Sequence, residues 1–99
     1  MSSSKKAPEN ETITKNVTII NSKGLHARPA ASFVRLANRF KCEVYVEKDG
    51  EKVNGKSIMG LMMLAAGPGC EITVQAIGHD AAQVVHELEE LIKRKFDEE

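Results

Sequence analysis

A histidine and an arginine two residues apart form the most informative pair in this chain. His26 and Arg28 belong to residues 24–30, which read G-L-H-A-R-P-A. An imidazole is a nucleophile when it is neutral, and the reference pKa of about 6.5 for histidine leaves a neutral fraction near pH 7. A guanidinium offers a planar set of donors that suits phosphoryl oxygens. The pair therefore predicts a histidine that accepts a phosphoryl group.

The flanking residues place this pair where a strand gives way to a helix. A β-branched run at residues 17–20 predicts a strand, and turn-forming residues follow at 21–24. From Ala30 onwards the apolar residues follow helical spacing, and Pro29 fits a first turn because it has no N–H group to lose. A helix start has unpaired N–H groups and the positive end of the helix dipole, which together favour an anion.

The rest of the chain predicts three more strands and two more helices. Alternation at residues 43–47 and 72–76 indicates strands, and Asp49 with Gly50 indicates a hairpin turn into a short strand around residue 53. Helices are expected from Ser57 to just before residue 67, and from Asp80 as an N-cap residue. The order β-α-β-β-α-β-α predicts an α+β fold, a two-layer open-faced sandwich in which three helices cover one face of a four-stranded antiparallel sheet. We assign residues 1–14 to a flexible N-terminal extension and residues 15–99 to one folded domain.

The second predicted helix carries further candidates. A serine before a helical run is usually an N-cap, but the helix dipole would also tolerate a phosphate on Ser57, so both roles stay open. Met59 and Met63 are four residues apart on a common face. They either fill the core or stay exposed as an adaptable apolar patch for a partner. His79 and His86 lack the pattern that surrounds His26, and we expect them at the surface.

Composition excludes several classes of function. Fourteen basic and fourteen acidic residues cancel, and aromatic residues make up only 4% of the chain, so neither nucleic acid nor a membrane surface is an expected partner. Cys42 and Cys70 lack the spacing of metal ligands, and we expect no metal and no cofactor. The first residues lack the apolar core of a signal peptide, so we expect a cytoplasmic protein. Nothing in the sequence indicates self-association, and a monomer is expected.

Two segments carry a resemblance to a known family. Residues 24–30 and residues 55–64, which read G-K-S-I-M-G-L-M-M-L, closely resemble the two signatures of the HPr family. These are the histidine-containing phosphocarrier proteins of the bacterial phosphoenolpyruvate-dependent phosphotransferase system. The likeness extends over residues 14–96 and follows the same order of elements.

The resemblance implies a role for each matching residue. His26 would accept a phosphoryl group on Nδ1 from phosphorylated Enzyme I and donate it to an enzyme IIA domain. Arg28 and the helix-start amides at Ala27 and Arg28 would stabilise that group. Ser57 matches a regulatory serine, which would bring in a serine kinase/phosphorylase and a transcriptional regulator as partners. The residues that match the partner-docking face are Ala27, Arg28, Ala31, Ile58, Met59, Met62 and Met63.

Alternatives within and outside the family remain open. Residues 53–66 also resemble the nitrogen-branch carrier, which regulates by binding partners, whereas Pro29 fits the sugar-branch carrier better. A regulatory form of the family lacks the histidine, and His26 argues against that form. One arginine and a few amides suit a carrier that returns its phosphoryl group rather than an enzyme that turns over on its own. A small phosphatase would need a nucleophilic cysteine loop or a carboxylate pair, and neither motif is apparent in the sequence.

Overall fold

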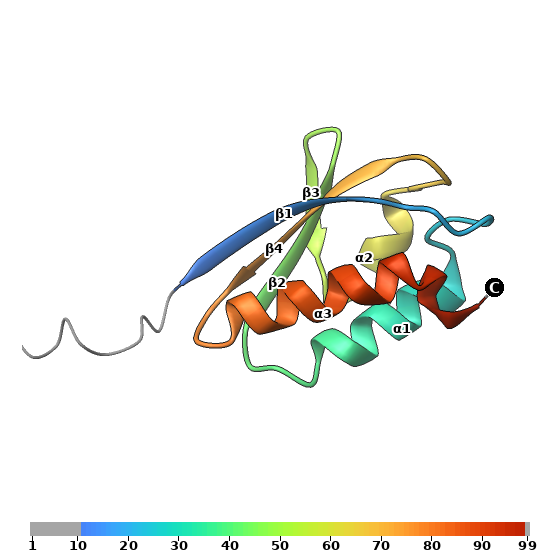
Figure 1. The fold of residues 1–99 in the computed structure, drawn as a ribbon. Coiled ribbons are helices and arrows are strands. Elements are labelled where there is room, and N and C mark those ends of the chain that lie inside the picture. The colour runs from blue at the N-terminus through green and yellow to red at the C-terminus, as the bar shows by residue number, and fades with distance from the viewer. Residues whose placement is uncertain (1–10, 99) are drawn as a thin grey trace, which may run out of the picture.

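Strands and helices alternate along the chain in the predicted order. The computed structural model describes residues 11–98. The elements are β1 (Thr12–Thr18), α1 (Ala27–Ala37), β2 (Glu43–Lys48), β3 (Glu51–Asn54), α2 (Ile58–Met63), β4 (Glu71–Ile77), α3 (Ala81–Lys93) and a final turn, η2 (Lys95–Asp97). The strands form one antiparallel sheet in the spatial order β1-β4-β2-β3. The helices lie on one face of this sheet (Figure 1), which confirms the predicted open-faced sandwich.

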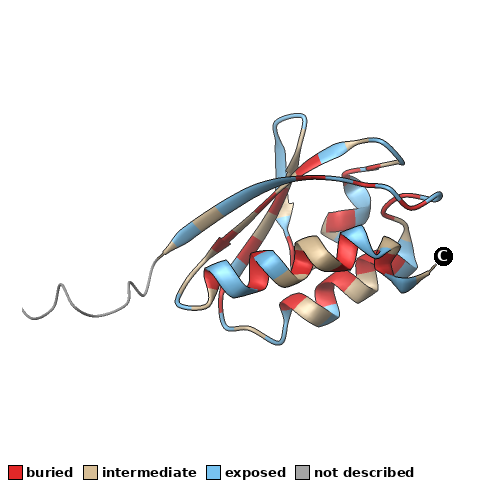
Figure 2. Ribbon diagram, viewed as in Figure 1, coloured by how far each residue is buried: buried red, intermediate tan, exposed pale blue. Residues whose placement is uncertain are grey.

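The core lies between the inner face of the sheet and the helices. Alternate residues of β4 are buried, and Val46 of β2 faces Val74 of β4 in the register of the sheet. On the helical side, α1 buries Phe33 and α3 buries Leu88 and Ile92. Figure 2 shows the buried residues of α1 and α3 along the sides that face the sheet and each other. Burial of this apolar surface is the main force that holds the two layers together.

The hairpin between β2 and β3 confirms the turn predicted from the sequence. Asp49 and Gly50 both have positive φ angles, 52° and 84°, and connect the paired residues Lys48 and Glu51. Two consecutive positive φ angles match the twist of a two-residue hairpin, and Gly50 adopts such an angle without steric cost.

The N-terminal boundary differs from the prediction. Strand β1 begins at Thr12, so residues 12–14, which we assigned to the extension, belong to the sheet. Ile13 packs against the core, and this contact extends the strand beyond the β-branched run that the sequence shows. Of the other predicted extension residues, Glu11 accepts the Gly78 N–H at 2.9 Å, and residues 1–10 lie outside the described residues.

Two helix ends also differ from the prediction. Helix α2 ends at Met63, before the expected stop near residue 67, because Ala65 takes a positive φ of 52°. Asp80 precedes α3 as predicted, but its side chain makes no capping hydrogen bond. Within residues 11–98 no helix is both long and apolar enough to cross a bilayer.

Candidate functional site

A tightly held loop carries His26 from the end of β1 to the start of α1. The Leu25 N–H donates to the Ala66 carbonyl at 2.8 Å, and the buried Asn21 side chain donates to the Gly24 carbonyl at 2.8 Å. Gly24 has a φ of +67°, and a Cβ atom there would lie 2.5 Å from the Ala66 oxygen. Only glycine allows the two loops to approach this closely. The backbone before the histidine is therefore fixed by hydrogen bonds and close packing.

His26 is the N-cap residue of α1, which agrees with the prediction that it lies where a strand gives way to a helix. Its carbonyl accepts the Ala30 N–H at 2.9 Å, whereas its side chain makes no capping hydrogen bond. The ring is therefore available for other contacts, and the side chain is 38% exposed. In the first turn the N–H groups of Ala27 and Arg28 have no intrahelical partner, and Pro29 has no N–H group. These donors therefore lie at the start of the helix that follows the partly exposed imidazole.

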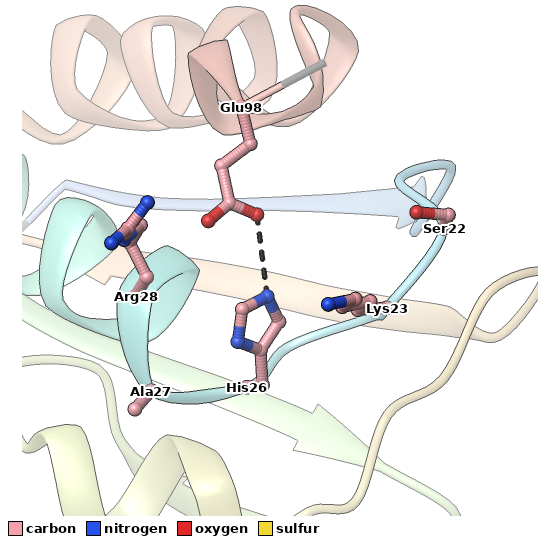
Figure 3. A pocket seen from close by; sticks show the side chains of 6 residues that line it. All are labelled: Ser22, Lys23, His26, Ala27, Arg28 and Glu98. Atoms are coloured by element: carbon pink, nitrogen blue, oxygen red, sulfur yellow. Dashed lines mark hydrogen bonds and ion pairs between the residues drawn. The ribbon is translucent and has the colours of Figure 1, made fainter.

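A hollow of about 510 Å³ opens over the histidine ring. Its lining residues come from the loop before α1, the first turn of α1 and the C-terminal end of the chain (Figure 3): Ser22, Lys23, His26, Ala27, Arg28 and Glu98. Lys23 and Arg28 are exposed, and neither forms an ion pair or hydrogen bond with the residues that the structure describes. Two such cations beside the helix start favour an anion in the hollow.

Lys23 and Glu98 also belong to this site, and neither was predicted from the sequence. Glu98 Oε1 lies 3.3 Å from His26 Nε2, although the two residues are 72 positions apart in the sequence. Only the tertiary structure brings them together, so no local motif could have indicated the contact. Lys23 is close to His26 in sequence, but the residue types at 21–24 predict only a turn. The predicted pair His26 and Arg28 does line one hollow.

Ser57 caps α2, which is one of the two roles that the sequence left open for this residue. Its hydroxyl accepts the Gly60 N–H at 3.0 Å, and the residue is half-buried. The preceding Lys56 donates from Nζ to the Phe40 carbonyl at 2.7 Å, which ties the start of α2 to the segment after α1. This cap satisfies one of the free N–H groups at the helix start.

The exposed face of α2 forms an apolar patch. Of the two alternatives that the sequence left open for Met59 and Met63, the structure supports exposure, because they are 73% and 64% exposed. Ile58 and Met62 are 41% and 43% exposed. We call these four residues the α2 patch. Methionine-rich surfaces of this kind adapt readily to a partner.

The patch and the histidine are neighbours. Met62 and His26 line a second, shallower hollow of about 300 Å³. Of the other residues in the predicted docking set, Ala27 and Arg28 are exposed and Ala31 is half-buried. The structure thus brings the two sequence signatures to one surface, with the His26 imidazole at its edge.

The remaining candidates lie elsewhere. His79 and His86 are exposed, and neither lines the hollow over His26. Within residues 11–98 no group of three or more histidine, cysteine or acidic side chains is arranged to hold a metal ion.

Comparisons with known proteins agree with this geometry. The family model of the HPr component phosphorylation site of the phosphotransferase system matches residues 13–94. The phosphocarrier protein HPr of Neisseria meningitidis serogroup A is 46% identical over 86 residues, which cover 87% of this chain and 97% of that protein. The HPr-like protein Crh of Halalkalibacterium halodurans is 48% identical over 83 residues, covering 84% of this chain and 99% of that protein. A crystal structure of HPr from Thermoanaerobacter tengcongensis superposes with a TM-score of 0.84 at 45% identity, covering 88% of this chain and 98% of that one.

Proposed function

Since this chain belongs to the HPr family of phosphotransferase-system phosphocarriers, we propose that His26 accepts a phosphoryl group from phosphorylated Enzyme I and donates it to an enzyme IIA domain. The observation that carries the proposal is the position of His26 at the N-cap of α1, in a hollow shared with Lys23 and Arg28. An imidazole there has both access to solvent and donors for the oxygens of a transferred group.

The proposed step exchanges one bond to phosphorus for another. The lone pair of His26 Nδ1 forms a bond to phosphorus, and the bond between phosphorus and the donor group breaks, with its electron pair leaving on the donor. In Figure 3 Nδ1 lies on the side of the ring towards the first turn of α1, away from Glu98. The amides of Ala27 and Arg28 and the Arg28 guanidinium then bind the phosphoryl oxygens. The reverse exchange with a IIA domain returns the imidazole.

The test is transfer of label from phosphoenolpyruvate through Enzyme I. We expect an acid-labile phosphoryl group on the wild-type chain and none on His26→Ala. His79→Ala and His86→Ala are matched controls, because both histidines are exposed but lie outside the hollow. Undiminished label on His26→Ala would refute the proposal.

We also propose that Enzyme I and the IIA domains dock on the α2 patch together with Ala27, Arg28 and Ala31. Support comes from the exposed methionines and from the hollow that Met62 shares with His26. Met59→Ser should raise the KM of Enzyme I for this chain about fivefold, the effect of losing one contact of about 1 kcal/mol. Ile20→Ser is the control, since Ile20 is 45% exposed but belongs to no part of the patch. Equal KM values for both variants would argue against docking on the α2 patch.

Ser57 is proposed as a regulatory site for a serine kinase/phosphorylase. A phosphate on its hydroxyl would add roughly two negative charges next to Ile58 and Met59, at the edge of the docking patch. This charge should weaken docking of Enzyme I and create a new surface for a transcriptional regulator. Ser57→Asp should reduce transfer from Enzyme I, and Ser57→Asn, which keeps a capping side chain without charge, should not. If the two variants transfer equally, a charge switch at Ser57 is excluded.

Within the family we propose the sugar branch, in which the carrier feeds sugar uptake. Pro29 in the first turn of α1 supports the sugar branch over the nitrogen branch, and the presence of His26 argues against the regulatory form that lacks the histidine. The identities to the HPr and Crh relatives are similar, at 46% and 48%. Incubation of the phosphorylated chain with sugar-branch and nitrogen-branch IIA domains decides the branch. Faster transfer to the nitrogen-branch domain would favour the regulatory alternative.

We propose that the chain acts as a monomer in the cytoplasm and needs no cofactor. Each step described above uses residues of a single chain. Light scattering should give a mass near 10.9 kDa, and a mass of twice that value would contradict the monomer.

A further inference from the structure

The last residues of the described chain reverse direction after α3 and return to the histidine. Lys95, Phe96 and Asp97 have φ angles of 57°, 56° and 60°, so three consecutive residues other than glycine are in the left-handed region. Such residues persist there only where the surrounding structure holds them. Packing and hydrogen bonds around the turn η2 must therefore hold these three residues in place.

Two anchors hold η2 in place. The Phe96 side chain is 3% exposed and belongs to the core. The Arg94 guanidinium donates to both carboxylate oxygens of Asp97, at 3.0 Å and 3.4 Å, and this hydrogen bonding raises the pKa of Arg94. Backbone hydrogen bonds from Asp97 to Arg94 and from Glu98 to Lys95, each 3.0 Å, close the turn. The residue that follows η2 is therefore delivered to a defined position.

That residue is Glu98, and its carboxylate meets the histidine ring. Oε1 lies 3.3 Å from His26 Nε2, and the Glu98 side chain is only 17% exposed. Figure 3 shows the carboxylate above Nε2, whereas Nδ1 lies lower on the ring, on the side of the first turn of α1. A carboxylate only accepts hydrogen bonds, so the proton of a neutral ring belongs on Nε2 in this contact, and the lone pair is left on Nδ1.

We propose that Glu98 is a positioning residue for His26. By accepting the Nε2–H group, Glu98 selects the tautomer and the ring orientation that present a nucleophilic Nδ1 to the start of α1. The turn η2 places Glu98 in the position where it can accept this hydrogen bond. This inference rests on the proposed phosphocarrier function. The inference also gives the left-handed turn a structural role, the placement of Glu98. The phosphoryl transfer step itself does not require such a turn.

Three variants separate the hydrogen bond from the charge. Glu98→Ala removes both, Glu98→Gln keeps an acceptor oxygen without the charge, and Glu87→Gln removes one negative charge from α3 outside the hollow. Nitrogen-15 NMR of the unphosphorylated chain reports whether the His26 Nε2–H is protected from exchange with solvent. Transfer from Enzyme I is measured in parallel.

We expect a protected Nε2–H in the wild type, in Glu98→Gln and in Glu87→Gln, but not in Glu98→Ala. Transfer should fall about two- to tenfold in Glu98→Ala, the range that one ordinary hydrogen bond accounts for, and Glu98→Gln should restore it. A protected Nε2–H and full transfer in Glu98→Ala would overturn the assignment. The two readouts distinguish the failures, because absence of label from the wild type refutes the phosphocarrier function, whereas absence of a protected Nε2–H from the wild type refutes the Glu98 contact.

Discussion

Gly24→Ala tests how the fold positions the reactive loop. The glycine sits at a φ of +67°, and an added Cβ atom would lie 2.5 Å from the Ala66 oxygen and 2.8 Å from the Gly67 Cα atom. Both neighbours are backbone atoms, so neither can rotate away as a side chain would. The Ala66 oxygen also accepts the Leu25 N–H at 2.8 Å, and any shift that relieves the clash weakens this bond.

The expected loss of stability has two parts. An alanine in the left-handed region costs about 1–2 kcal/mol, and forcing packed atoms apart costs about 1–3 kcal/mol more. Gly24→Ala should therefore lower the free energy of unfolding by roughly 2–5 kcal/mol. Gly50→Ala is the matched control, because Gly50 has a φ of +84° and its Cβ atom would meet nothing within 4 Å. That variant should lose only about 1–2 kcal/mol.

Urea unfolding measures the difference directly. With a slope of about 1–3 kcal/mol per molar urea, the midpoint of Gly24→Ala should fall below that of Gly50→Ala by roughly 1 M. Phosphoryl transfer to the folded fraction of Gly24→Ala should also slow, since His26 follows this loop. Equal midpoints for the two variants would show that the loop is not clamped in the way the structure describes.

Three further predictions concern the supports of the site and the surface of the sheet. Ser57→Ala should lower the unfolding free energy by about 1 kcal/mol through loss of the bond from Gly60 N–H, and denaturation compared with the capping variant Ser57→Asn tests this. Phe96→Ala should lower the free energy of unfolding by about 3–5 kcal/mol in urea denaturation, because Phe96 is buried. A loss below about 0.5 kcal/mol, which is typical of an exposed residue, would contradict its place in the core. The hydrogen bond from Tyr45 to Glu43 raises the pKa of Tyr45 above 10.0, so the absorbance titration of this tyrosine should move to lower pH in Glu43→Gln and stay unchanged if the contact is absent.

The sequence predicts the elements that local patterns specify. Helix α1, the Asp49–Gly50 hairpin and the Ser57 cap all follow from side-chain periodicity or from turn and cap preferences within a few residues. These preferences act over short distances and therefore survive in the folded chain. For Met59 and Met63 the sequence allowed both a buried and an exposed position, because periodicity alone does not show which face of a short helix meets the core.

The rest of the site depends on contacts that sequence patterns do not contain. Nothing about Lys95, Phe96 and Asp97 as residue types predicts three successive positive φ angles, since tertiary packing of Phe96 holds them. Glu98 therefore reaches His26 by a route that only the structure reveals. Asp80 is a favourable residue type for an N-cap, but its side chain makes no capping hydrogen bond. Its backbone conformation before α3, which the sequence does not reveal, accounts for the difference.

The most direct test of the central claim is to identify the phosphorylated atom. The chain, labelled with nitrogen-15 and phosphorylated through Enzyme I, should show phosphorus–nitrogen coupling at Nδ1 of His26, the nitrogen that lies towards the first turn of α1. Coupling at Nε2, the atom that contacts Glu98, or a phosphoryl group on any other residue would contradict the account.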